Sequence, residues 1–286
     1  SAAAGMLLAS LAHSVGWPIP VRGSQAIADA LIADLRAHGG VLHSDTEVTE
    51  PPAGVVLFDT APTALLRIYD DRLPARYANR LRRYRFGAGV AKVDFVLSDD
   101  VPWSDARLAS AVTFHLGGDR EDMAYAEAQV AAGRHAERPM VLAALPHLAD
   151  PGRVDDHGRR PFWTYAHVPA GSTVDQTEAV TNVVESFAPG FRDVVVAVRS
   201  VPAARMTGHN ANYVGGDIAV GGNNAWRALA GPVARLNPWT TPLPGVYLCS
   251  SATPPGAGVH GMSGYYAART MLRREFVIDR PPGLAP

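Results

Sequence analysis

The stretch LPGVYLCSSATPPGAGVHGMSGYYAART, at residues 243–270, constrains the fold more than any other part of the chain. It joins a short apolar run, a loop rich in proline and glycine, and a segment of small residues that suits a closely packed helix. A strand that passes through a glycine loop into a helix is a unit of α/β proteins, whose ligands sit beyond the carboxyl ends of the strands. The stretch therefore predicts an α/β fold and the location of a binding site.

Composition excludes several classes of protein. The 286 residues are 47% hydrophobic and 19% charged, with a net charge of -1. This is an ordinary globular composition, and it leaves no basic footprint for nucleic acid. Cys249 is the only cysteine, so the chain holds no internal disulfide and no CxxC pair for zinc; its apolar neighbours predict a small buried side chain. The ten histidines form no HxH or HExxH pattern, and no metal site is expected.

Targeting signals are weak in this sequence. No apolar run reaches the roughly 18 residues that span a bilayer. The apolar N-terminus, SAAAGMLLASLAHSVGW, lacks the basic residues that open a signal peptide. We therefore expect a cytoplasmic protein.

Periodicity gives the first sixty residues an α/β character. Residues 24–38 predict a helix with Ser24 as its N-cap and an apolar face of Ile27, Ala28, Leu31, Ile32 and Leu35. Strands are predicted at 41–48 and 54–62, followed by a helical stretch that includes 63–68 and 76–84.

The middle of the chain has a different character. A helix is predicted at 173–187, and strand patterns occur at 89–98, 110–118, 139–148, 161–169 and 193–203. Successive strands with few helices favour a mixed or antiparallel sheet, an α+β arrangement. The predicted organisation is a first domain made of residues 1–62 and 236–286 and a second domain at 63–235.

Glycines give the loop of the opening stretch its chemistry. Gly256, Gly258 and Gly261 remove side chains, so the backbone can approach a flat ligand. The helix that begins near 259–262 presents unpaired N–H groups and the positive end of its dipole, which suit a carbonyl oxygen that gains negative charge. A tight turn that binds nothing has the same spacing, so spacing alone leaves both interpretations open.

This stretch is similar to the C-terminal flavin-binding signature of the phytoene-desaturase-like FAD-dependent oxidoreductases, in the branch of pyridine-nucleotide-disulphide-oxidoreductase-domain proteins. GWPIPVRGSQAIADAL, LPARYANRLRRYRFGAGVAKVDFVLSDDVPW, FWTYAHVPAGS, ESFAPGFRDVV and NANYVGGDIAVG resemble further blocks of that family. The resemblance runs from about residue 5 to 274. It implies a flavoprotein that has a Rossmann-like FAD domain and a separate substrate domain, and that transfers hydride between FAD and a hydrophobic substrate such as a polyene.

The resemblance also implies site residues. His260 would lie beside the flavin ring as the catalytic candidate, although a residue at a helix start often bonds the backbone instead. The cofactor-binding residues it implies are Gly23, Val48, Pro255, Gly256, Gly258, Val259, Gly261 and Met262.

One family element is absent. Full-length members begin with a strand, a GxGxxG loop and a helix that hold the pyrophosphate, and this sequence has no such loop. We expect the chain to be the C-terminal two-thirds of a family member, a fragment that binds FAD weakly or not at all. It would self-associate or pair with the missing segment, and a long apolar substrate would bring peripheral membrane contact.

Substrate candidates come from two blocks. Trp163, Tyr165 and His167 alternate on one strand and would line a flat apolar tunnel, or belong to the core. Asn212 and Tyr213 would donate hydrogen bonds, or serve their own turn. Lys92 and Asp94 share one strand face, which is usually solvated.

Two other functions remain open at the level of sequence. A non-catalytic assembly module that pairs with another subunit would expose an apolar surface. An amine-oxidase-type flavoenzyme would need an aromatic cage, for which Tyr265 and Tyr266 are the nearby residues.

Overall fold

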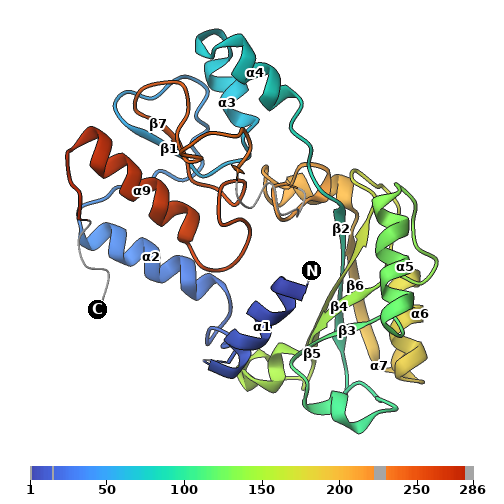
Figure 1. Cartoon of the computed structure of the whole chain (residues 1–286). Helices are drawn as coiled ribbons and strands as arrows, with labels where there is room; N and C mark the ends of the chain where they lie inside the picture. Colours follow the sequence, from blue (N-terminus) through green and yellow to red (C-terminus); the bar gives the residue numbers. More distant parts are fainter. Residues whose placement is uncertain (1, 15, 222–229, 281–286) are drawn as a thin grey trace.

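The computed structural model describes residues 2–14, 16–221 and 230–280, and its strands form two sheets (Figure 1). The larger sheet has five strands in the order β3-β4-β5-β2-β6, and every neighbouring pair is antiparallel. Its strands are β2 (Gly89–Leu97), β3 (Thr113–Leu116), β4 (Val141–Ala144), β5 (Arg160–Val168) and β6 (Val195–Val201). Four of them lie within stretches predicted as strands, and β5 begins one residue before its predicted stretch. The combination of helices, parallel strands and antiparallel strands confirms the α/β class.

The core of the larger sheet follows from alternation along β2 and β5. Phe95 and Phe162 face α6 (Thr177–Phe187) and α7 (Phe191–Val194). The residues that alternate with them along each strand point to the other face of the sheet. The rings of Phe95, Phe162 and Phe191 pack within 5.9 Å of one another. Burying each such side chain stabilises the fold by about 1.5–3 kcal/mol. Helix α5 (Arg120–Ala131) packs beside the same sheet (Figure 1).

The smaller sheet joins two distant parts of the chain. β1 (Val56–Phe58) pairs in parallel with β7 (Val246–Leu248), so that Leu57 lies opposite Tyr247. Helices α3 (Ala64–Tyr69), α4 (Ala75–Arg82) and α9 (Met262–Glu275) accompany it. The chain thus leaves this sheet and returns to it, as predicted. The domain boundaries at 62/63 and 235/236 stay a prediction.

The first helices differ from the rest in their burial. α2 (Gln25–Ala37) forms where it was predicted, but the Ser24 hydroxyl makes no cap hydrogen bond and no α2 residue is buried. Its predicted apolar face is exposed, with Leu31 at 67%. α1 (Ala2–Ser14) was not predicted. In the described ranges, no helix has the length and hydropathy needed to cross a bilayer.

The strand predicted at 41–48 is wrong. The segment is irregular, and Val41, Leu42 and Val48 are exposed. A strand needs a neighbour that accepts and donates its backbone hydrogen bonds, and nothing in the described part of the chain pairs with this segment.

A segment of short helices connects the two sheets. After β6 come η5 (Ala203–Gly208) and η6 (Val214–Gly216). Buried Asp217 then accepts backbone hydrogen bonds from Gly87, Ala219 and Gly221. Since Gly87 precedes β2, these bonds connect the chain just before the first strand of the larger sheet to the segment that follows η6. The remaining short helices are η1 (Asp70–Arg72), η2 (Ala106–Ser110), η3 (Pro146–Leu148) and η4 (Pro151–Arg153).

Candidate functional site

The first part of the site is the glycine loop, residues 253–261, which begins near the carboxyl end of β7 and leads into α9. The parallel pairing continues past β7, because the Cys249 N–H donates to the Phe58 carbonyl. Helix α9 then begins at Met262, directly after Gly261. The sequence prediction of strand, loop and helix is confirmed in this region. The loop therefore lies where α/β sheets hold their ligands.

The backbone of the glycine loop is open to solvent. Gly256 and Gly261 have φ of 104° and 62°, and a Cβ atom on either would meet nothing within 4 Å. Val259 is 91% exposed and Pro255 is also exposed, whereas Met262 is half-buried. Positive φ and open space together allow a flat ligand to approach the backbone closely. Five of the predicted cofactor residues, together with Gly258, are thus contiguous on one accessible surface.

His260 has a definite local role in this loop. Its Nδ1 atom accepts a hydrogen bond of 3.0 Å from the Met262 N–H, at the first turn of α9. A Cβ at Gly258 would come within 2.6 Å of the His260 ring, so the glycine leaves space for that ring. The contact matches the alternative in which His260 serves the helix start; its place beside a flavin stays a prediction.

Two polar groups follow the paired strands directly, Asp59 after β1 and Cys249 after β7. Burial raises the pKa of Asp59. Burial, and then the charge of Asp59, raise the pKa of the Cys249 thiol to about 12. A thiol with so high a pKa is protonated near neutral pH and is a poor nucleophile. The sequence context predicts a buried side chain, but Cys249 is half-buried and lies directly after β7.

The other predicted cofactor residues lie apart from the glycine loop. Gly23 sits in a turn with φ of 105° against the Arg153 guanidinium. Val48 is exposed in the irregular segment described above. Neither makes a hydrogen bond to the glycine loop in the part of the chain that the structure describes.

The predicted substrate residues separate into two places. The Asn212 side-chain oxygen accepts a hydrogen bond of 2.8 Å from the Ala61 N–H, just beyond β1. Tyr213, next to it, lies with its ring 6.3 Å from that of His209. Asn212 therefore binds the end of the smaller sheet, while the three aromatic residues of β5 lie on the larger one.

The second part of the site is the aromatic face, which comprises Lys92, Asp94, Trp163, Tyr165 and His167. These side chains lie on the side of β2 and β5 opposite the phenylalanine core, with Lys92 across from Tyr165 and Asp94 across from Trp163. The rings of Trp163 and Tyr165 are 5.3 Å apart, and those of Tyr165 and His167 are 5.8 Å apart. The predicted shared face of the three β5 residues is confirmed.

Charges give the aromatic face a polar character that sequence reasoning underestimated. The Lys92 ammonium pairs with Asp94, and its side chain is only 22% exposed. The ammonium also lies 4.4 Å from the centre of the Trp163 ring, a cation–π contact. Burial lowers the pKa of Lys92, and the hydrogen bond that its ammonium donates to Asp94 opposes this change. The solvated face expected for these two residues is therefore wrong for Lys92.

Glu127 on α5 completes this face and was not predicted. Its carboxylate oxygens lie 2.9 Å from His167 Nδ1, which donates the hydrogen bond. Burial, and then Glu127, raise the pKa of Tyr165. Glu127 is a half-buried acid within α5, and its place in the sequence does not by itself identify a partner.

Cavities border the aromatic face on two sides. One measures 450 Å³, within the size range of small-molecule sites, and is mainly apolar; its lining residues include Ile19, Pro20, Val96, Ala144, Pro161 and Trp163. The other measures 620 Å³ and has charged side chains in its wall; it is lined by Lys92, Asp94, Arg199, Val201, Arg205, Met206, Thr207, Gly208 and His209. Asp94 lines both cavities. The face can therefore contact a ligand that has an apolar body and a polar end.

A metal site is not part of this arrangement. Over the described ranges, no three His, Cys, Asp or Glu side chains are grouped so that they could hold an ion. The site consists of exposed backbone, aromatic rings and ion pairs.

Known proteins resemble this chain over most of its length. No family model matches it. It is 23% identical over 300 residues to pyridine nucleotide-disulfide oxidoreductase domain-containing protein 2 of Rattus norvegicus, covering 90% of this chain and 51% of the relative. The Mus musculus protein of that name is 24% identical over 296 residues, covering 93% and 50%. The chain thus spans about half the length of these curated relatives.

A solved structure shares the fold. The crystal structure of an oxidoreductase from Methanosarcina mazei superimposes with a TM-score of 0.56 at 16% sequence identity. The match covers 88% of this chain and 55% of that one. At this identity the likeness establishes the fold and leaves function to the chemistry of the site.

Proposed function

We propose that this chain is part of an FAD-dependent oxidoreductase of the phytoene-desaturase-like class. The observation that carries the proposal is the glycine loop, whose backbone is open at Gly256 and Gly261 and leads into the N-terminus of α9. Relatives named pyridine nucleotide-disulfide oxidoreductase domain-containing protein, and a structural neighbour described as an oxidoreductase, support the same general activity.

The residues present fit the ring end of a flavin. The glycine loop offers a flat ligand unhindered backbone, and the N–H groups that open α9 favour an oxygen with negative charge. When bound there, FAD would supply the hydride acceptor for oxidation of a substrate C–H bond. This chain would hold and orient the ring, and positioning would carry much of the catalysis. Because the sequence has no GxGxxG loop, it would hold the cofactor's phosphates poorly.

The substrate would lie on the aromatic face. The apolar cavity beside Trp163 suits a hydrophobic substrate, which would be dehydrogenated or isomerised. The charged groups at Lys92 and Arg199 border the other cavity and would contact a polar end of that substrate. Substrate and cofactor would then occupy different sheets, as in the two-domain organisation that the sequence predicts.

Thiol chemistry is not part of the proposed reaction. Cys249 is the only cysteine of the chain, and its pKa is raised to about 12. A dithiol–disulfide cycle needs two cysteines and a reactive thiolate. We therefore expect Cys249→Ser to leave flavin binding unchanged.

The test is a titration of FAD with this chain and with this chain joined to a strand–GxGxxG–helix unit, followed by flavin absorbance and fluorescence. We expect weak or no binding by this chain alone and tighter binding by the joined protein, because the added loop would hold the cofactor's phosphates. In the joined protein, Val259→Asp should weaken binding at least tenfold, because it places a negative charge on the exposed loop. Val174→Asp, an equal change at an exposed position outside the glycine loop, should have no effect. Equal behaviour of the two variants would contradict the proposed site.

The exposed face of α2 favours a second candidate function, an assembly module without catalysis. Ile27, Leu31 and Leu35 are 41%, 67% and 44% exposed. An apolar stripe of this kind on one helix is typical of a surface that packs against protein. A full gene product that binds no flavin but forms a stable complex through α2 would favour this function over the enzyme.

The amine-oxidase interpretation gains less support. Tyr266 packs its ring 5.2 Å from Trp239, and Tyr265 packs 5.4 Å from Tyr266. These contacts engage both tyrosines in the packing of α9. They leave no described pair of parallel rings to form an amine cage beside the glycine loop.

A further inference from the structure

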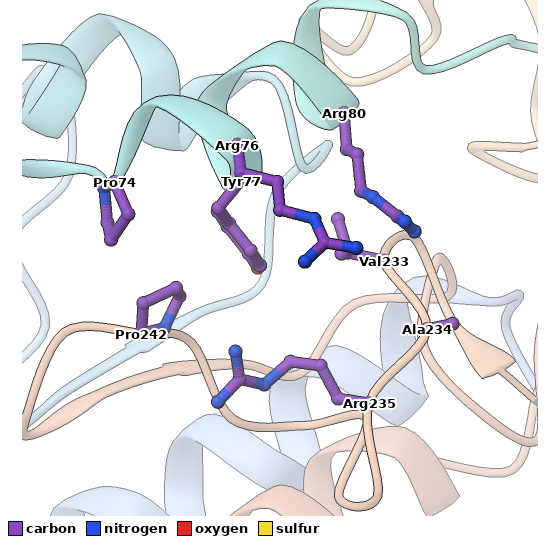
Figure 2. A pocket seen from close by; sticks show the side chains of 8 residues that line it. All are labelled: Pro74, Arg76, Tyr77, Arg80, Val233, Ala234, Arg235 and Pro242. Atoms are coloured by element: carbon purple, nitrogen blue, oxygen red, sulfur yellow. The ribbon is translucent and has the colours of Figure 1, made fainter.

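Three arginines converge on a pocket that the proposed function does not use. The pocket has a volume of 420 Å³ and is lined by Pro74, Arg76, Tyr77, Arg80, Val233, Ala234, Arg235 and Pro242. Figure 2 shows Arg76 and Arg80 reaching into it from α4, while Arg235 approaches from the loop on the opposite side. Pro242 comes before β7 and the glycine loop comes after it, so the two sites lie at different ends of that strand.

The arginines lack acidic partners. In the described part of the chain, no ion pair involves Arg76, Arg80 or Arg235. Asp70 pairs with Arg82, and Glu47 pairs with Arg67, so neither carboxylate is paired with the pocket arginines. Like charges at positions i and i+4 of a helix destabilise it. A chain whose net charge is -1 thus concentrates three unneutralised cations in one hollow.

The pocket is also built to orient those cations. The Arg235 Nε atom donates to the Thr240 hydroxyl at 3.3 Å, which holds one edge of its guanidinium and leaves the terminal nitrogens available. Tyr77 is buried, and Figure 2 shows its side chain beside that of Arg76. Burial raises the pKa of Tyr77 to about 12, and the charge of Arg235 opposes that rise. The phenol therefore stays neutral and can donate a hydrogen bond.

We propose that this pocket binds the phosphate or pyrophosphate group of a small organic molecule. Guanidinium groups match phosphate oxygens in charge and in geometry, because each can donate two parallel hydrogen bonds. The volume far exceeds that of a single anion and falls in the range of small-molecule sites. Pro74, Val233 and Pro242 supply apolar walls for the organic part.

The test is isothermal titration calorimetry of this chain with ADP and with inorganic pyrophosphate, in buffer of low ionic strength. We expect both to bind, and ADP to bind at least as tightly because its organic part contacts the apolar walls. Arg76→Gln, Arg80→Gln and Arg235→Gln should each weaken binding at least tenfold, since each removes a charge-assisted contact. Arg80→Lys should keep part of the affinity, because lysine retains the positive charge but cannot donate the two parallel hydrogen bonds of a guanidinium.

Matched controls separate this site from general charge effects. Arg120→Gln removes the same charge from the exposed start of α5 and should leave ADP binding unchanged. Val259→Asp in the glycine loop should also leave it unchanged, so that failure of the flavin proposal does not decide this one. Circular dichroism confirms that each variant is folded.

Other outcomes would overturn the assignment. Binding of pyrophosphate without ADP would mean a site for a free anion. If the chain binds phosphatidylcholine vesicles that contain phosphatidic acid through the three arginines, and does not bind ADP, the pocket would be a site for lipid headgroups at a membrane. Absence of binding, or equal loss in Arg120→Gln and Arg80→Gln, would mean that the arginines form no specific site.

Discussion

The helices of this protein differ in how much of their apolar face is buried against a sheet. Beside the five-stranded sheet, α6 buries Val180, Val183 and Val184 against the phenylalanine core. Beside the two-stranded sheet, α3 and α4 bury Leu65 and Leu81 in the same manner. Helix α2 belongs to neither core, although its sequence also has an apolar face. A helix with an apolar face therefore gains its stability only where a sheet is present to cover that face.

Many of the exposed apolar side chains lie in the first 48 residues of the chain. A two-stranded sheet is marginally stable on its own, and here it depends on the long-range packing of α3, α4 and α9. The exposed segment at 41–48 and the exposed face of α2 are consecutive in sequence. No α2 residue is buried, and Val41, Leu42 and Val48 are exposed.

The largest expected effect tests the core of the five-stranded sheet. Phe162→Ala removes a fully buried ring that packs against Phe95 and Phe191. It should lower the free energy of unfolding by about 3–5 kcal/mol, measured by urea denaturation. The matched Leu31→Ala on α2 should change it by less than about 0.5 kcal/mol. A large loss of unfolding free energy in Leu31→Ala would mean that the face of α2 is as important for stability as the phenylalanine core.

The next effect concerns the connection between the regions. Asp217→Ala leaves the N–H groups of the half-buried residues Gly87, Ala219 and Gly221 without their acceptor. We expect a loss of about 2–3 kcal/mol and, in urea, a separation of the two regions into two transitions followed by tryptophan fluorescence. Asp217→Asn keeps one side-chain acceptor oxygen and should lose less. A single unchanged transition in Asp217→Ala would show that other contacts couple the regions.

A smaller, pH-dependent effect tests the two-stranded sheet. Tyr247 donates a hydrogen bond to Glu275 of α9, and burial followed by this bond raises its pKa to about 12. A phenol whose pKa rises on folding stabilises the fold below its unfolded pKa of about 10, and that stability is lost as pH rises through the folded pKa. Tyr247→Phe should cost about 1–2 kcal/mol at pH 8.

The pH profile distinguishes this bond from simple packing. Between pH 10 and 12, urea midpoints of the unmodified chain should fall more steeply than those of Tyr247→Phe. The exposed Tyr125→Phe should follow the unmodified chain. Parallel profiles for all three proteins would exclude the role given to Tyr247.

The smallest effect on stability tests the exposed face itself. Leu31→Gln replaces an exposed apolar side chain on α2 and should change the free energy of unfolding by less than about 0.5 kcal/mol. It should nevertheless reduce self-association of the chain, measured by sedimentation velocity. Leu148→Gln, at an exposed position beside the larger sheet, is the control. Equal behaviour of the two variants would mean that α2 is not a docking face.

The sequence predicts most elements because their signals are local. Alternation identifies β2 and β5, and the glycine loop identifies the junction of β7 with α9. The strand expected at 41–48 fails because a strand depends on a neighbour, which no local pattern supplies. Helix α1 was missed because its small and apolar residues carry no clear period; the apolar face of α2 was read correctly, but its exposure was not.

The site was predictable only in part. The contiguous glycine loop follows from spacing, and the shared face of Trp163, Tyr165 and His167 follows from alternation. The pairing of His167 with Glu127 joins β5 to α5, and the pocket of Arg76, Arg80 and Arg235 joins α4 to a loop about 155 residues further along the chain. Such combinations arise from the tertiary fold, and sequence periodicity gives no information about them.

The parallel pairing of β1 with β7 also has a consequence for how the chain folds. Leu57 and Tyr247 are partners, and all five strands of the larger sheet lie between them. Closing so long a loop costs chain entropy and slows the pairing. The larger sheet, once folded, shortens the effective distance between the two ends and thereby reduces this cost. Folding should proceed from the middle of the chain outward, and the glycine loop should acquire its shape only in the final step.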